Sequence, residues 1–531
     1  MRKIAINSIV LCAALLAASA LEAAVRMPRI FSDNMLVQRE KPAKFWGTAD
    51  PDAKVEIEFA GQRKSTTAGA DGKWSLSLKP LKASAAPRDM LVYENGKLSA
   101  TIKNVLVGEL WILSGQSNMQ WTLKATEDVK DATARANYPN LRYFKMSQGA
   151  MSEKPLSDFG AEAHWELTTP QNVQSYSAVG FYFGEKLLND LNVPVGLIQT
   201  AMGGTLMACW TPQEYIETVP YQKGYYQKYL KDSEAYVKSG EYPKRLAAYK
   251  KNLAGHEAAC KKADAEGKPR PPYDWNKLAY PLPYTPYRTH EVPVFHWNAK
   301  VAPMAGITAR GVVWYQGEQE SGYGGGNKPA VDSFGAMYQN MVNAWREKWG
   351  DEKLWFLSVA LPSFGGGKLW ASLRSQQLSA VKNLKYAQIA NTIDTGYEND
   401  VHPHDKTLVG QRVAKLAEKS VYNKKKMSAA EAFAPEFVSA DFKKDGVLVK
   451  FDTFGGKLVG KGEPRGFELE IDGKWVEAIP EIRGKRIFVA APDGAGTPTA
   501  VRYLWKPWAK PQVWLYSNTD LPAFPFECVK K

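Results

Sequence analysis

Hydrophobic and polar positions follow different patterns in three regions of the chain. From residue 24 to about 104, short alternating runs such as "KVEIEF" and "WSLSL" are separated by turn sequences such as "ADPDA" and "ENGK". Alternation bounded by Gly, Asp and Asn predicts a small antiparallel β domain over residues 24–104. The same pattern returns after residue 424, in "GVLVKFDT" and "FELEIDGKW", and predicts a C-terminal β module over residues 425–531.

The middle region, residues 105–424, instead alternates continuous apolar runs with amphipathic segments. The candidate strands are residues 105–113, 141–146, 193–200, 311–316, 354–361 and 386–393. One helix is predicted over 177–191, where apolar residues recur every four positions, and another over 407–421. Parallel strands covered by helices on both faces have this pattern, so we expect an α/β domain with a parallel sheet.

A long Tyr- and Lys-rich stretch, about residues 211–291, interrupts the sheet pattern. Strong helix formers dominate it up to the proline-rich "KPRPPYDW". We expect a helical insertion. The sequence leaves open whether it is a lid or wall beside a functional site or a surface excursion without a catalytic part.

The first 23 residues have the pattern of a secretory signal peptide. Arg2 and Lys3 precede an apolar stretch over residues 9–18, and small residues follow up to Ala23, where cleavage is expected. The pattern predicts export, in bacterial style, to the periplasm or the extracellular space. No later window holds about 18 uninterrupted apolar residues, so no transmembrane helix is expected.

Length and charge narrow the class of protein further. A chain of 531 residues exceeds what one hydrophobic core usually serves. The net charge of +14 comes from lysines spread along the chain rather than gathered in one stripe. Together with export, this argues against a nucleic-acid partner. Nothing in the sequence specifies an oligomeric state.

Polar residues follow four of the predicted strands. They are Ser117 in "SGQSNM", Gly203 and Gly204 in "TAMGGT", Gln316 in "VVWYQGEQE" and His402 in "ENDVHPHDK". The carboxyl ends of parallel strands lie on one edge of the sheet, which is where ligands bind in such folds. We therefore expect these side chains to meet at one site.

These residue types fit nucleophilic catalysis. A serine hydroxyl needs a base to take its proton, and a histidine with a near-neutral pKa can do so. Backbone N–H groups of glycines and a side-chain amide can stabilise a developing oxyanion. Asp400 lies two residues before His402, so in an extended segment it faces the same side and could orient the imidazole. The alternative is that Asp400 caps a helix beginning near Pro403.

The blocks "LVGELWILSGQSNMQW", "GGTLMACW", "GVVWYQGE" and "NDVHPHDK", in this order, resemble the sialate O-acetylesterase family of the SGNH-hydrolase superfamily. The similarity extends to "MPRIFSDNMLVQREKPAKFWGTADP" and "TDLPAFPFE". The resemblance implies a flavodoxin-like, three-layer α/β/α catalytic domain flanked by β modules. It also implies removal of O-acetyl groups from sugars.

Carried over by position, the resemblance implies a role for each site residue. Ser117 would be the nucleophile and His402 the base, with the Ser117 N–H, a glycine N–H of the 203–204 pair and the Gln316 amide as the oxyanion hole. Further implied residues are Asn118, which would position the nucleophile, and Glu318, which would organise the Gln316 loop.

This chain departs from the superfamily pattern in two places. The superfamily has its acid three residues before the histidine, where Asn399 stands here. Asp400 is therefore a provisional third member of the triad, with Asp394 in reserve. In addition, the Gly-rich "QGEQESGYGGGNK" replaces a shorter motif of relatives beside the site.

The residues and the resemblance together predict an exported serine esterase that removes O-acetyl groups from carbohydrate, with sialic acid as the expected sugar, and that needs no cofactor. The pair of histidines in "HPH" has no accompanying carboxylate–histidine signature, so no metal site is predicted. Alternative hypotheses are an acetylesterase acting on xylan, pectin or another polysaccharide, and an inactive carbohydrate-binding relative.

Overall fold

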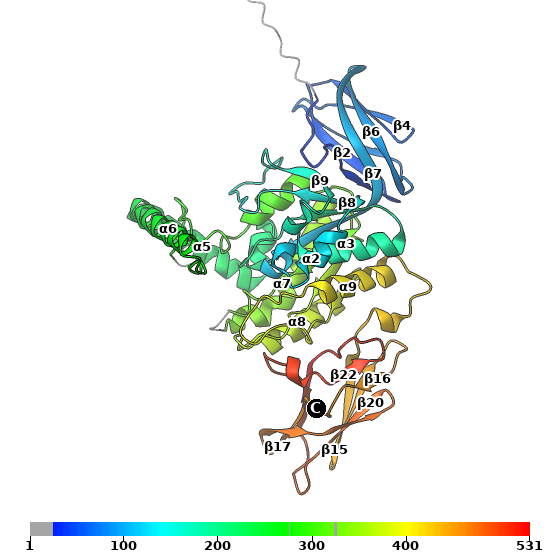
Figure 1. Ribbon diagram of the computed structural model, residues 1–531, viewed down its shortest axis with the longest axis vertical. Helices are drawn as coiled ribbons and strands as arrows, with labels where there is room; N and C mark the ends of the chain where they lie inside the picture. Colours follow the sequence, from blue (N-terminus) through cyan, green and yellow to red (C-terminus); the bar gives the residue numbers. More distant parts are fainter. Residues whose placement is uncertain (1–24, 275–276, 323–325, 531) are drawn as a thin grey trace, which may run out of the picture.

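The computed structural model describes residues 25–274, 277–322 and 326–530. The predicted signal peptide, residues 1–23, lies outside the described residues. Figure 1 shows a β module at each end of the molecule and an α/β domain between them, with a pair of long helices projecting from its side. In the described part of the chain, no helix is long and apolar enough to cross a membrane.

The N-terminal β module is built from antiparallel pairings, except that its first strand, β1, pairs in parallel with its last, β7. Its strands are β1 (Leu36–Gln38), β2 (Ala43–Thr48), β3 (Lys54–Phe59), β4 (Gln62–Thr67), β5 (Lys73–Leu78), β6 (Ser84–Glu94) and the first part of β7 (Lys97–Gly115). Strand β5 shows why the sequence forms a strand, since its exposed and buried residues alternate strictly and its apolar side chains all face the core.

Strand β7 runs through both the N-terminal module and the α/β domain. Its first half pairs with β6 in the N-terminal module, and its second half is a central strand of the α/β domain. The expected boundary between residues 104 and 105 therefore falls inside a single strand. A positive φ of 58° at Asn104 and a register irregularity opposite it mark the change in pattern.

The central sheet has the strand order β13-β12-β11-β7-β10-β8-β9. Its further strands are β8 (Tyr138–Lys145), β9 (His164–Thr168), β10 (Val195–Gln199), β11 (Gly311–Tyr315), β12 (Trp355–Val359) and β13 (Ala387–Ala390). All neighbours pair in parallel except β8 and β9. Strands β8, β9 and β10 lie on one side of β7, and the later strands β11, β12 and β13 lie on its other side. The switch point of the sheet is thus at β7.

Helices cover both faces of this sheet. The helices are α1 (Ser117–Gln120), α2 (Val129–Arg135), α3 (Ala178–Leu191), α7 (Lys328–Trp349), α8 (Trp370–Lys382) and α9 (Thr407–Leu416). Helix α3 packs against α9, and α7 packs against α8. Strands β10 and β11 are buried at every position, as strands covered on both faces must be. The predicted α/β fold with a central parallel sheet is confirmed.

Helix α3 begins and ends where its sequence dictates. The Ser177 hydroxyl accepts a hydrogen bond from the Gly180 N–H at 3.1 Å and so caps the first turn. The helix ends at Asn192, whose left-handed backbone (φ 52°) is a common stop for a helix.

The segment between β10 and β11 is helical, with α4 (Gln213–Ile216), α5 (Pro220–Ser239) and α6 (Tyr242–Ala265). Helices α5 and α6 form the hairpin that projects from the α/β domain in Figure 1. Ala263 is the one buried residue among those described on α6. Near its base, the hairpin is held by the Tyr225 hydroxyl, which donates to the Glu291 carbonyl at 2.8 Å.

The C-terminal module has its own hydrophobic core. Its strands are β14 (Glu436–Lys443), β15 (Gly446–Asp452), β16 (Leu458–Gly460), β17 (Phe467–Ile471), β18 (Lys474–Ala478), β19 (Pro480–Arg483), β20 (Arg486–Ala490), β21 (Ala500–Tyr503), β22 (Leu515–Ser517) and β23 (Phe526–Val529). They form two four-stranded sheets and one pair, and their buried side chains form a cluster separate from the core of the rest of the chain.

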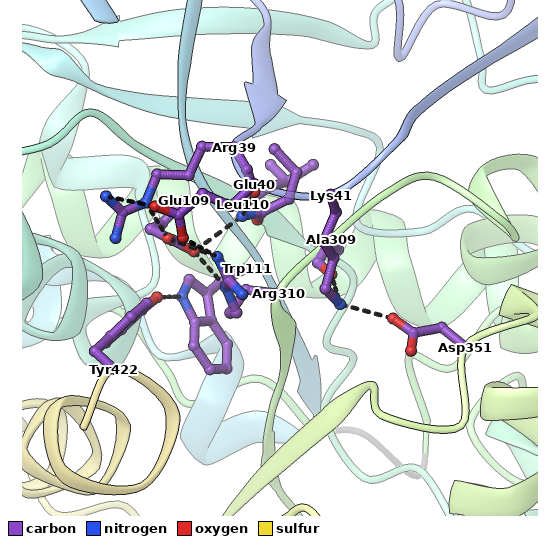
Figure 2. A network of polar contacts seen from close by, with 11 residues as sticks. Arg39, Glu40, Lys41, Glu109, Leu110, Trp111, Ala309, Arg310, Asp351 and Tyr422 are labelled. Carbon is purple, nitrogen blue, oxygen red and sulfur yellow. Dashed lines mark hydrogen bonds and ion pairs between the residues drawn. The ribbon is translucent and has the colours of Figure 1, made fainter. Parts of the chain in front are cut away.

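A buried ionic network joins the N-terminal module to the central sheet (Figure 2). Glu109, on β7, is wholly buried and accepts hydrogen bonds from Arg39 at 2.5 Å and from Arg310 at 2.7 and 2.9 Å. The Arg310 guanidinium holds the pKa of the Glu109 carboxyl below its usual range despite burial, which alone would raise it. Close by, Lys41 binds Asp351 at 2.7 Å.

Candidate active site

Ser117 lies at the carboxyl end of β7, at the switch point of the sheet. The strand ends at Gly115, whose φ is +126° and where an added Cβ would come within 2.1 Å of the Tyr315 carbonyl oxygen. Glycine is therefore required by both conformation and space. The chain then turns at once into α1, and Ser117, its first residue, is half-buried.

His402 reaches Ser117 from the loop between β13 and α9. Its Nε2 lies 2.8 Å from the Ser117 Oγ, which is hydrogen-bond distance. The two residues are 285 positions apart in the chain and follow β7 and β13, two strands of one sheet that have β11 and β12 between them. This is the arrangement of a hydroxyl nucleophile and its base.

Asp400 contacts the His402 backbone more closely than the His402 ring. Its Oδ1 accepts from the His402 N–H at 2.8 Å and lies 3.7 Å from Nδ1, beyond hydrogen-bond distance. Its Oδ2 lies 3.2 Å from His404 Nε2. The reserve candidate, Asp394, is held by two hydrogen bonds from Arg412 at 2.6 and 2.7 Å.

Trp121 supports the imidazole from its face. The His402 ring stacks on the indole at 4.9 Å between centroids and 19° between planes, and the His404 ring stacks on it at 5.4 Å and 12°. Sequence reasoning did not assign Trp121 a role, although it ends the block "SGQSNMQW". The ring orientation of His402 is thus fixed by stacking and by its anchored backbone.

The His402 imidazole is held in its neutral form. Burial, followed by the positive charge of Lys406, lowers the pKa of His402 to about 4. A neutral imidazole can accept the serine proton, so the ring is ready to act as a base over the whole neutral range.

Gly203 lies directly against the serine, but its N–H is already occupied. A Cβ added at Gly203 would lie 3.3 Å from the Ser117 Cβ. The Gly203 N–H donates to the side-chain oxygen of Gln120 at 2.7 Å. Gly204 has a φ of +72°, and a Cβ added there would lie 3.2 Å from the imidazole ring of His290. Gln120 is a residue that sequence reasoning did not single out.

Gln316 supports the glycine loop from beneath. Its buried side-chain nitrogen donates to the Thr205 carbonyl at 3.1 Å and to the Glu320 carboxylate. Both amide protons are therefore engaged within the protein. Glu320 also accepts from the Met207 N–H at 2.6 Å, and burial raises the pKa of Glu320 to about 7.

Glu318 connects the loop that carries Gln316 to the nucleophile turn. Its Oε1 accepts from the Asn118 side-chain amide at 2.6 Å, and Asn118 Nδ2 also donates to the Val401 carbonyl at 3.1 Å. The Asn118 oxygen accepts from Lys406 Nζ at 2.5 Å. Lys406 stands in the block "NDVHPHDK", yet sequence reasoning gave it no role.

The described residues hold no group of three or more His, Cys, Asp or Glu side chains arranged to bind a metal ion. The chemistry available at this site is that of the Ser117 hydroxyl, the His402 imidazole and the surrounding N–H donors.

Known proteins resemble this chain along most of its length. The sequence model of the family described as "Carbohydrate esterase, sialic acid-specific acetylesterase" matches residues 107–248 and 293–419, about half of the chain. The sialate O-acetylesterase of Rattus norvegicus is 23% identical over 93% of this chain and 93% of its own, and that of Homo sapiens is 25% identical over 94% and 92%.

A solved structure agrees with these sequence relatives. A carbohydrate acetylesterase from Xanthomonas citri superposes with a TM-score of 0.75 at 26% identity, covering 95% of this chain and 99% of that one. This chain therefore belongs to the sialic acid-specific acetylesterase family of carbohydrate esterases, and it is a carboxylic ester hydrolase that deacetylates carbohydrate.

Proposed function

We propose that this protein is an exported serine esterase that removes O-acetyl groups from sialic acid through an acetyl-serine intermediate. The observation that carries the serine mechanism is the 2.8 Å contact between Ser117 Oγ and His402 Nε2 at the switch point of the sheet. Burial and Lys406 lower the pKa of His402 to about 4, so at neutral pH the ring is in the unprotonated form that a base requires.

In the first half of the reaction, His402 takes the proton of Ser117 while Oγ forms a bond to the acetyl carbonyl carbon. The carbonyl oxygen becomes an oxyanion, which backbone N–H groups beside Ser117 stabilise. The bond between that carbon and the sugar oxygen then breaks. His402 gives its proton to the departing sugar hydroxyl, and the acetyl group remains on Ser117.

The second half repeats these steps with water. His402 takes a proton from water, and the resulting hydroxide attacks the acetyl-serine. The bond to Ser117 Oγ breaks, the proton on His402 returns to the serine, and acetic acid leaves and releases its own proton to the solvent as acetate. The cycle needs no oxidant, reductant or cofactor.

Of the two loop glycines, Gly204 is the better candidate for the backbone donor of the oxyanion hole. The Gly203 N–H already donates to Gln120, so using it would require the Gln120 side chain to move. The Ser117 N–H is the second donor of the proposal, and Gln316 acts by holding the loop in place through Thr205.

Two features support the finer parts of the proposal. The curated relatives are named sialate O-acetylesterases, which favours sialic acid over plant polysaccharides as the sugar. The sequence of residues 1–23 favours export to the bacterial periplasm or beyond. Expression of the full chain followed by mass spectrometry of the exported protein tests this, with Ala24 expected as the new N-terminus.

The central experiment measures acetate release by the mature protein and by Ser117→Ala. The substrates are 4-nitrophenyl acetate, an O-acetylated sialoglycan and acetylated xylan. We expect Ser117→Ala to lose several orders of magnitude in kcat on every substrate. Ser439→Ala, at an exposed position of β14, is the matched control and is expected to keep full activity.

The outcomes separate the hypotheses. Preferred release from the sialoglycan supports sialic acid as the substrate, whereas preferred release from xylan replaces it with a plant polysaccharide. Near-normal turnover by Ser117→Ala contradicts the serine mechanism. Silence of the wild-type protein on all three substrates favours a carbohydrate-binding protein.

A further inference from the structure

We propose that Lys406 is a positioning residue of this esterase, which fixes Asn118 beside Ser117 and places a buried positive charge over Trp121, the ring on which His402 stacks, so that the free imidazole stays neutral. The inference rests on the proposed Ser117–His402 chemistry. It adds a residue that contacts neither substrate nor reacting atoms.

Lys406 ties together the segments that carry the site. It directly precedes α9, and its side chain is wholly buried. Its Nζ donates to the Asn118 oxygen at 2.5 Å, while the Asn118 nitrogen donates to Glu318 at 2.6 Å and to the Val401 carbonyl at 3.1 Å. One amide thereby joins the nucleophile turn, the loop after β11 and the loop that carries His402.

The positive charge of Lys406 has no carboxylate in direct contact among the described residues. Its polar partner is the neutral Asn118 amide, and the aromatic rings of Trp121 and Tyr315 each lie 5.8 Å from Nζ. Glu318 stands on the far side of Asn118. A buried charge that is not neutralised at contact distance acts strongly on its neighbours, because the surrounding dielectric is low.

The charged and titratable groups around His402 shift its pKa in opposite directions. Asp400 raises the pKa of His402, whereas burial, Lys406 and His404 lower it, with burial the largest cause and Lys406 the second. Groups that face Lys406 itself are Glu318, Asp400 and Asp405, all of which favour its charged form against burial. Burial lowers the pKa of Lys406 to about 7, so Lys406 is charged at the acidic pH where His402 titrates.

Three substitutions separate the charge of Lys406 from its hydrogen bond. Lys406→Gln removes the charge but keeps an N–H donor, Lys406→Met removes both, and Lys406→Arg keeps both. The experiment measures kcat/KM for 4-nitrophenyl acetate against pH, with the melting temperature of each variant recorded.

We expect the acid limb of the profile to move to higher pH in Lys406→Gln and Lys406→Met and to stay near the wild-type position in Lys406→Arg. Below the shifted limb, each pH unit of displacement lowers kcat/KM about tenfold. Lys406→Met should also lose kcat at neutral pH, because Asn118 loses its donor. Lys415→Met, a half-buried lysine of α9 with no contact to Asn118 or His402 among the described residues, is the control and should leave the profile unchanged.

An acid limb that stays in place in folded Lys406→Gln overturns the electrostatic role. If the neutral variants fail to fold, the wild-type protein supplies a second measurement, the titration of His402 followed by NMR of labelled imidazole carbons. Titration near the ordinary histidine value of about 6.5 overturns the proposal. Failure of the serine mechanism looks different, since Ser117→Ala then keeps its activity whatever the profiles of the Lys406 variants show.

Discussion

At the scale of single residues, the proposed base, His402, has no carboxylate at hydrogen-bond distance from its ring among the described residues. Asp400 holds the His402 backbone and lies 3.7 Å from Nδ1, while Trp121 supports the face of the imidazole. Stacking and a fixed backbone restrict the ring rotations that a carboxylate restricts in a triad.

The substitution Asp400→Asn tests whether Asp400 acts through the His402 backbone rather than through the His402 ring. The asparagine oxygen can still accept from the His402 N–H, so the loop should keep its shape. We expect a loss in kcat below about 30-fold, far smaller than the loss of about 10⁴ that such a change causes in a full triad. The measurement is steady-state kinetics on 4-nitrophenyl acetate, with His402→Ala as the reference for complete loss of the base. A loss near that reference would show that Asp400 acts directly on the ring.

The candidate site was predictable where residue type and strand end coincide. Ser117 and His402 both follow apolar runs, and the edge of a parallel sheet brings such residues together. The partners of Gln316 were not predictable, because they depend on how the loop folds back beneath the glycines. Lys406 was missed for a similar reason, since a lysine in a loop is usually exposed and here it is buried.

At the scale of elements, β7 connects the N-terminal module to the central sheet of the α/β domain. The change of pattern near residue 104 suggested a domain boundary, yet the structure has one continuous strand with an irregularity at Asn104. Over residues 97–104 of β7 only Ile102 is buried, whereas every residue from Val105 to Gly115 is buried, as in a strand covered on both faces. The pattern therefore predicted the change of environment correctly, but it could not show that a single strand spans both environments.

The Glu109 network should contribute strongly to stability at this junction. Glu109→Gln leaves two guanidinium groups close together without their shared carboxylate, so we expect a loss of about 3–5 kcal/mol in the free energy of unfolding. Glu40 is the control, because it lies 3.7 Å from Arg39 and 3.6 Å from Arg310 but is 59% exposed. Glu40→Gln should cost less than about 1 kcal/mol in chemical denaturation.

This prediction has a defined pH dependence. The pKa of Glu109 is lower in the folded protein than in the unfolded chain. The ionised Glu109 carboxyl therefore stabilises the fold in full above its pKa in the unfolded chain, about 4.5. This stabilisation is lost as the pH falls through its lower pKa in the folded protein. The gap in stability between wild type and Glu109→Gln should narrow in acid. Equal costs for Glu109→Gln and Glu40→Gln would contradict a special role for the buried carboxylate.

At the scale of the whole molecule, the three regions predicted from the sequence do not form three independent cores. The N-terminal module and the α/β domain share one continuous cluster of buried side chains, whereas the C-terminal module has its own. The C-terminal module still touches the catalytic loops, since Lys510 donates to the Gly396 carbonyl at 3.0 Å and the Phe364 N–H donates to Pro507 at 3.2 Å. Apolar contacts cross the junction as well, since Ile393 packs in the C-terminal cluster and Leu521 and Phe524 pack in the other one.

Two separate clusters of buried side chains predict two unfolding transitions in calorimetry. Leu469→Ala, a wholly buried change in the C-terminal core, should cost about 2–5 kcal/mol and lower the midpoint of one transition only. Leu357→Ala, an equally buried change in β12, should lower the other transition. Heat inactivation of the esterase should follow the transition that Leu357→Ala moves, because Ser117 and His402 are positioned by that core. A single transition that both substitutions shift alike would show instead that the contacts of Lys510 and Pro507 bind the two cores into one cooperative unit.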